Sequence, residues 1–237
     1  MPSSSFHDIA EAAVARGLLV RGGFHPGPDD AVPGDPATVI LIGNAGPDLW
    51  QAFENRTEDT LDTWTEKTVA AIATQFNARA LFPFDGPPHW PFQRWAQRCE
   101  PVFPAPIGSL IHPEYGLWHA YRAALLFDTP IDLPARNDAP NPCETCADKP
   151  CLTTCPVGAF KPDAYDVPVC LDHIAASQGE DCLGHGCAAR RACPIGRDYI
   201  YAPAQDIRAR PGPVSYAGVS HPGQTARIAS IPRNGWT

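Results

Sequence analysis

Cysteine placement constrains this chain more than any other feature of its sequence. Eight of the nine cysteines lie between positions 143 and 193, and the first 142 residues contain only Cys99. The N-terminus has no basic stretch followed by an apolar signal core, so the disulfides of a secreted protein are not favoured. The clustered thiols therefore predict metal or iron–sulfur ligands, and Cys99 is expected to be a core thiol.

The spacing of the clustered thiols favours two iron–sulfur clusters. The first half of the run, C-x2-C-x4-C-x3-C-P, ends at Cys155-Pro156, and the second half ends at Cys193-Pro194. A cysteine followed by proline belongs to bacterial ferredoxin signatures, and each cluster needs four thiolates. By ferredoxin analogy, Cys143, Cys146, Cys151 and Cys193 hold one [4Fe-4S] cluster, and Cys155, Cys170, Cys182 and Cys187 hold the other.

Two other arrangements of the thiols remain open from the sequence. Two zinc sites of four cysteines tolerate variable spacing, although such sites usually pair cysteines about two to four residues apart. Disulfides would need an oxidising compartment. Arg190 and Arg191 either offset the negative charge of a thiolate-ligated cluster or form a solvated basic turn.

Charge and hydropathy narrow the class of protein. Lys and Arg number 18 against 26 Asp and Glu, a net charge of −8, which is the wrong sign for affinity based on phosphate contacts. No apolar run approaches the roughly 20 residues of a membrane-spanning helix. We therefore expect a cytoplasmic protein with no membrane partner, and the charge disfavours nucleic acid as a partner.

Helical and strand patterns alternate over the N-terminal part of the chain. Ser5 followed by Asp8 is a capping-box pattern, and the next long segment is amphipathic at helical spacing. The predicted elements are helices over residues 5–17, 47–54 and 60–76 and buried strands over 38–42 and 78–82. This alternation indicates an α+β fold, built as an α/β sandwich.

An aromatic and histidine-rich segment follows, over residues 87–127. Large aromatic side chains fill protein cores, with histidines at the core edge. The same residue types would also line a flat apolar pocket for a planar ligand. Composition alone does not choose between the two. The residues concerned are His89, Trp90, Trp95, His112, Tyr115, Trp118, His119, Tyr121 and Arg122.

Residue order in this segment carries a family resemblance. The run from His112 to Arg122, His-Pro-Glu-Tyr-Gly-Leu-Trp-His-Ala-Tyr-Arg, precedes an apolar strand and resembles a stretch of CblC-type cobalamin-processing proteins. The resemblance implies a flavin-reductase-like or nitroreductase-like fold that holds a corrinoid with its nucleotide base off the cobalt. It also places Trp118 beside the ligand. The corrinoid-binding residues implied are His89, His112, Tyr115, Trp118 and Arg122.

A corrinoid-binding domain followed by an eight-cysteine module also resembles epoxyqueuosine reductase and the reductive dehalogenases, whose clusters pass electrons to base-off cobalamin. The resemblance implies an iron–sulfur oxidoreductase that takes electrons from an external donor. It would reduce the cobalt of a bound cobalamin or remove its upper ligand. The helical-repeat extension that epoxyqueuosine reductase carries for tRNA has no counterpart in this sequence.

Two other functions remain open from the sequence. A stand-alone ferredoxin-type electron carrier would need only the cysteine module. A cobalamin-dependent reductase of an organic substrate, resembling epoxyqueuosine reductase, would need an added acid, for which Glu114 and His119 are candidates. The predicted domains are a CblC-like domain over 1–135, a ferredoxin-like iron–sulfur module over 136–207 and an irregular tail over 208–237, with a proline-rich linker over 128–142.

Overall fold

The computed structural model describes residues 5–56, 58, 60–161, 164–202 and 205, so the predicted tail over 208–237 lies outside the described residues. The chain divides into two compact units. The first comprises Met1–Phe103, Leu110–Pro142 and Ile195–Ile200, and the second comprises Pro104–Ser109, Cys143–Pro194 and Tyr201–Thr237. The proline-rich stretch predicted as a linker thus belongs to the first unit, while the domain limits at residues 135 and 207 stay predictions.

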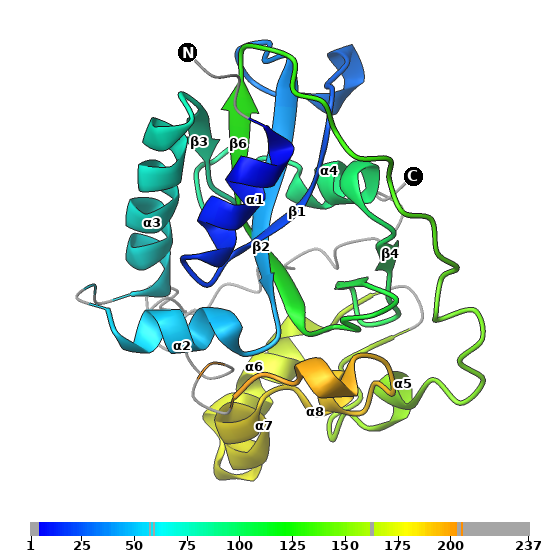
Figure 1. Cartoon of the computed structure of the whole chain (residues 1–237). Coiled ribbons are helices and arrows are strands. Elements are labelled where there is room, and N and C mark those ends of the chain that lie inside the picture. The colour runs from blue at the N-terminus through cyan, green and yellow to red at the C-terminus, as the bar shows by residue number, and fades with distance from the viewer. Residues whose placement is uncertain (1–4, 57, 59, 162–163, 203–204, 206–237) are drawn as a thin grey trace. The chain divides into compact units, whose positions relative to one another are not determined.

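A four-stranded antiparallel sheet organises the first unit (Figure 1). Its order is β1-β2-β6-β3, with β1 at Leu19–Phe24, β2 at Thr38–Ala45, β3 at Arg79–Leu81 and β6 at His119–Phe127. Every residue of β2 is buried, because strands flank it on both sides and helices cover both faces. The strands predicted over 38–42 and 78–82 are confirmed as β2 and β3. The apolar strand implied after Arg122 forms the C-terminal part of β6, which already begins at His119.

Helices cover the two faces of this sheet. On one face lie α1 (Phe6–Val14) and α3 (Leu61–Gln75), and on the other lies α4 (Phe92–Cys99) (Figure 1). The predicted capping box is confirmed, because the Ser5 hydroxyl accepts from the Asp8 N–H at 3.1 Å and the Asp8 carboxylate accepts from the Ser5 N–H at 3.2 Å. The helix predicted near 47–54 is α2 (Asp48–Glu54).

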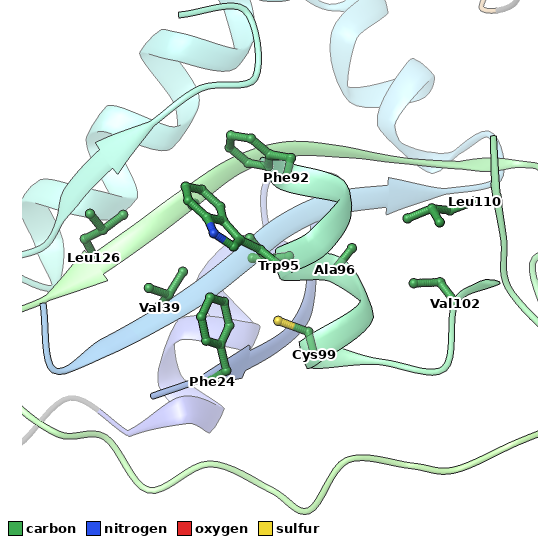
Figure 2. Packing of buried hydrophobic residues seen from close by; sticks show 11 residues of the cluster. Phe24, Val39, Phe92, Trp95, Ala96, Cys99, Val102, Leu110 and Leu126 are labelled. Atoms are coloured by element: carbon green, nitrogen blue, oxygen red, sulfur yellow. The ribbon is translucent and has the colours of Figure 1, made fainter. Parts of the chain in front are cut away.

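Helix α4 contributes four residues to a cluster of buried apolar side chains in the first unit (Figure 2). Its apolar residues Phe92, Trp95, Ala96 and Cys99 recur at helical spacing and pack on the sheet. Trp95 is fully buried, and Cys99 is 6% exposed, which confirms it as a core thiol. Part of the aromatic segment therefore fills the core, in a helix that the sequence analysis did not predict.

Two arginines lie at β-bulges of the sheet, Arg21 in β1 and Arg122 in β6. Between β1 and β2, the register passes from Val20↔Ile42 to Gly23↔Ile40, which leaves Arg21 and Gly22 opposite one residue. Between β2 and β6, the register shifts in the same way and leaves Arg122 as the extra residue. A bulge bends its strand and re-aims the bulged side chain, so both arginines point where a regular strand would not send them.

Close backbone approach makes Gly43, in β2 beside both bulges, intolerant of a side chain. A Cβ atom at Gly43 would lie closer than 3.0 Å to the carbonyl oxygen of Ala120. We expect Gly43→Ala to lower the free energy of unfolding by about 3 kcal/mol, measured by urea denaturation, because the central strands must separate. Gly27→Ala, whose Cβ would have only one neighbour at 3.9 Å, should change it by less than about 1 kcal/mol. Equal losses in the free energy of unfolding for Gly43→Ala and Gly27→Ala would contradict this prediction.

The remaining elements of the described chain are short. They are β4 (Phe103–Pro104), β5 (Leu110–Ile111), η1 (Pro28–Asp30) and η3 (Arg197–Tyr199), and, within Cys143–Pro194, α5 (Pro150–Thr153), α6 (Val167–Ala175), η2 (Ser177–Gly179), α7 (Glu180–His185) and α8 (Ala188–Arg191). The described buried apolar residues of the second unit are few and mostly small: Ala105, Ile107, Ala159, Cys182, Ala189, Cys193 and Tyr201. None of the described helices is both long enough and apolar enough to span a membrane.

Candidate functional site

A buried ion pair between Arg21 and Glu100 lies at the centre of the first unit's polar site. The Arg21 guanidinium donates through Nη2 to Glu100 Oε1 at 2.8 Å and through Nε to Oε2 at 3.2 Å. The two side chains are 2% and 11% exposed. Burial raises the pKa of Glu100, and the positive charge of Arg21 opposes that rise. The bulge at Arg21 makes this fork geometry available.

Aromatic rings lie over the Arg21 guanidinium. Its Cζ atom lies 5.0 Å from the centre of the Tyr115 ring and 5.2 Å from the centre of the Tyr121 ring. The Tyr121 hydroxyl also donates to Glu100 Oε1. The same guanidinium donates to the carbonyl oxygen of Asn44 at 3.0 Å. Arg21 is thereby held by charge, hydrogen bonds and ring faces together.

Two histidines border this pair, each with its tautomer set by backbone groups. His112 Nδ1 accepts from the N–H groups of Glu114 and Tyr115 at 3.1 and 3.2 Å, so its proton is on Nε2. Burial and the charge of Arg21 lower the pKa of His112 to about 4, which keeps the ring neutral near pH 7. His119 Nε2 lies 3.1 Å from the Leu110 carbonyl oxygen, which makes Nε2 the donor and leaves Nδ1 facing Arg21.

A pocket of about 280 Å³ opens beside the ion pair and lies wholly within the first unit. The Arg21–Glu100 pair and His112 line it, together with the segment from Pro134 to Asn137. Arg136 Nη2 in that segment donates to the Glu100 carbonyl oxygen at 3.4 Å. The complete lining is Phe6, Val20, Arg21, Gly22, Gly23, Cys99, Glu100, Pro101, His112, Glu114, Tyr115, Pro134, Ala135, Arg136 and Asn137.

The structure brings only part of the predicted corrinoid-binding set to this pocket. His112 and Tyr115 line it, and their rings stack with centres 4.3 Å apart. Trp118 is 1% exposed in the interior, and His89 lies in an exposed loop where its Nδ1 bonds the Asp85 carbonyl oxygen at 3.0 Å. Arg122 Nε donates to the Asn44 side chain at 3.1 Å. The corrinoid-binding roles of these residues stay predictions.

The size of the pocket limits what it takes in. Pockets that enclose a drug-sized ligand measure roughly 300 to 1,000 Å³, and a corrinoid is larger than such a ligand. A pocket of about 280 Å³ is therefore too small to enclose a whole corrinoid, but it has room for a small molecule or for one substituent of a larger ligand.

The two candidate acids occupy different settings. Glu114 lines the pocket and accepts a hydrogen bond from the Tyr199 hydroxyl. His119 is 9% exposed and lies between the Leu110 carbonyl and Arg21. Their proposed role as acids stays a prediction.

In the second unit, the thiols of the first predicted set are mutual neighbours. Burial, followed by the neighbouring thiols of Cys193, Cys151 and Cys146, raises the pKa of Cys143 to about 11. The pKa of Cys151 is raised by burial and then by the thiols of Cys193 and Cys146. All nine cysteines are free thiols. The four residues predicted as ligands of one cluster therefore gather in one place.

The second predicted set forms another neighbourhood. Burial raises the pKa of Cys187, the backbone N–H groups of residues 189 and 190 lower it, and the Cys170 and Cys182 thiols raise it. Tyr165 joins Cys155 to this group, since burial and then contacts with Cys170, Cys187 and Cys155 raise its pKa. Within the described residues, no three ligand-type side chains are placed to hold a single metal ion. The division into two sets of four coincides with the predicted pairing, which stays a prediction.

The chain is a mixed helix-and-sheet protein with eight clustered thiols, and known reductases share its fold. The structure is similar to that of epoxyqueuosine reductase from Streptococcus thermophilus, with a TM-score of 0.53 and 14% identity over 81% of this chain and 66% of that one. It is similar to epoxyqueuosine reductase bound to an epoxyqueuosine-modified tRNA-Tyr stem loop (TM-score 0.54, 14% identity, 85% and 68% coverage). The Bacillus subtilis enzyme gives a TM-score of 0.51 at 13% identity, with 85% and 68% coverage.

These likenesses establish the fold and no more, since all three identities are low and the chain spans about two thirds of each neighbour. No protein-family model matches the sequence, and no curated protein matches it by sequence either. One neighbour was solved with a tRNA stem loop, so nucleic acid is a possible partner for a protein of this fold, against the expectation drawn from the net charge of this chain.

Sequence reasoning missed the Arg21–Glu100 pair. A signal was present, because Arg21 interrupts an apolar strand pattern and two glycines follow it directly. An arginine in such a strand needs a buried partner, and adjacent glycines suggest a bulge. The pattern does not identify the partner, which lies 79 residues further along the chain.

Proposed function

We propose that this chain is an iron–sulfur oxidoreductase that reduces an organic substrate with the help of a corrinoid. The observation that carries the proposal is the gathering of eight thiols into two sets of four, in a chain that shares its fold with epoxyqueuosine reductase. When bound, two [4Fe-4S] clusters would supply low-potential electrons to the corrinoid.

The chain's own groups suit the holding of clusters. The thiols are mostly half-buried, which limits access of water and oxidants. Backbone N–H groups point at the sulfurs, as where Ala159 N–H donates to Cys155 Sγ at 3.3 Å. Such hydrogen bonds stabilise thiolate charge and raise the potential of a cluster. The raised pKa of Cys143 means that its thiol would release a proton when it binds iron.

Iron content tests the ligand sets. Anaerobically prepared protein should carry about eight irons per chain with matching sulfide, because two clusters hold four irons each. Cys146→Ala should remove about four of these irons, while Cys99→Ala should remove none, since Cys99 belongs to the core around α4. Stoichiometric zinc without sulfide, or an equal loss of iron in both variants, would refute the cluster assignment.

The number of corrinoid molecules converted per chain distinguishes a reductase that uses cobalamin as a cofactor from one that uses it as the substrate. With excess cyanocobalamin and a chemical reductant, about one corrinoid per chain should stay bound through gel filtration if it serves as a cofactor. Removal of cyanide from many equivalents would favour cobalamin as the substrate, which the resemblance of residues 112–122 to CblC-type proteins supports. If no corrinoid binds, an electron carrier becomes the better account. An epoxyqueuosine-modified stem loop is the first organic substrate to test, because a neighbour of this fold binds one.

A further inference from the structure

The pocket of the first unit presents one free donor and one free acceptor side by side. The donor is the Nε2–H of His112, whose proton position follows from the two backbone N–H groups bonded to Nδ1. Among the described residues, no acceptor lies within hydrogen-bond distance of that Nε2–H. Glu100 Oε2 lies 3.8 Å from this Nε2 atom, which is too long for a direct hydrogen bond.

The acceptor is the remaining lone pair of Glu100. A carboxylate offers about four acceptor positions. The described donors to Glu100 are three, namely Arg21 Nη2 and the Tyr121 hydroxyl at Oε1, and Arg21 Nε at Oε2. One position is thus left at Oε2, the oxygen nearest to His112. Both side chains line the pocket.

The charges around the pocket favour a neutral ligand. Arg21 and Arg136 contribute two positive charges, Glu100 and Glu114 contribute two negative charges, and His112 is neutral near pH 7. A ligand with net charge would gain little from such a balanced lining. A neutral group with an acceptor and a donor on two atoms bonded to the same carbon would satisfy both free positions. The amide is the common organic group with that pattern.

We propose that this pocket binds an amide edge, with the ligand's carbonyl oxygen accepting from His112 Nε2–H and its N–H donating to Glu100 Oε2. The ring of His112 is held in place by stacking on Tyr115, and Glu100 is held by Arg21, so both partners are positioned before the ligand arrives. This goes beyond the proposed function and does not depend on the clusters. The amide could belong to a planar lactam, as in a nucleobase, or to an open-chain carboxamide, as on the rim of a corrinoid.

Small lactams test the site directly. In spectra of 15N-labelled protein, 2-pyridone should shift the His112 side chain and the Gly22 and Gly23 amides, which line the pocket, with millimolar affinity. N-methyl-2-pyridone keeps the ring and the carbonyl but lacks the N–H, so it should bind at least about tenfold more weakly. Equal binding of the two probes, or no shift with 2-pyridone, would overturn the proposal.

A matched pair of variants controls for folding. His112→Phe keeps an aromatic ring for Tyr115 but removes the N–H, and it should abolish the 2-pyridone shifts at Gly22 and Gly23. His25→Phe, at an exposed histidine outside the pocket, should leave them unchanged. Far-UV circular dichroism shows whether each variant folds. If folded His112→Phe still binds 2-pyridone with wild-type affinity, the proposal fails.

Competition identifies the source of the amide. Guanosine displacing 2-pyridone would support a lactam, and dicyanocobinamide displacing it would support a carboxamide arm. If neither displaces it while propionamide does, a small free amide is the ligand. Iron content and corrinoid retention, measured on the same preparation, test the proposed function separately. A negative result for the amide site therefore leaves the proposed function testable, and the reverse also holds.

Discussion

Arg21→Met should lower the free energy of unfolding of the first unit by about 4 kcal/mol. Methionine fills a similar length, but the Glu100 carboxylate would remain buried without its guanidinium partner. Breaking one side of a buried pair is costly because the other charge stays desolvated. Five of the six tryptophans lie in the first unit, at positions 50, 64, 90, 95 and 118, so tryptophan fluorescence during urea denaturation reports on this unit.

An exposed ion pair provides the matched control. Arg79 lies 3.5 Å from Asp128, with the two side chains 47% and 82% exposed, so Arg79→Met should cost less than about 1 kcal/mol. Adding Glu100→Leu to Arg21→Met removes the stranded charge and should recover about half of the loss. If Arg21→Met lowers the free energy of unfolding no more than Arg79→Met does, the buried Arg21–Glu100 pair stabilises the fold no more than an exposed pair.

Removing iron by anaerobic chelation should unfold the second unit while the first unit persists. The described apolar residues buried in the second unit are mainly alanines and cysteines, and α6 has no buried residue among those described. Such a core is too small to offset the conformational entropy lost on folding, so bound metal must supply the difference. Limited proteolysis should then cut within Cys143–Pro194, where no tryptophan lies.

Fluorescence distinguishes this local unfolding from a general loss of structure. The tryptophan emission of the first unit should change little after chelation, because its core around α4 and the sheet holds large buried side chains such as Trp95 and Leu126. Protection of Cys143–Pro194 from protease after complete iron loss would show that a conventional core holds the second unit. A simultaneous shift in tryptophan emission would show that the two units unfold together.

Features that depend on neighbours in the chain were predictable from the sequence. Ser5 and Asp8 form the expected capping box because the hydrogen bonds join residues three apart. Strand β2 followed from a short β-branched run, and the helix of Thr60 to Phe76 from apolar periodicity. The eight thiols were identifiable as ligand candidates because iron chemistry selects the residue type, and their spacing indicated two sets.

Features that depend on distant residues were decided by the tertiary structure. The bulge at Arg21 sends that side chain to a carboxylate 79 residues away, and no local pattern specifies such a partner. Trp118 and His112 lie six residues apart in the same motif, yet one is in the interior and the other lines the pocket. Sequence by itself thus determined which side chains are available for cluster and ligand chemistry. Tertiary packing decided which of them meet, because bulges and burial arise only when strands and helices pair.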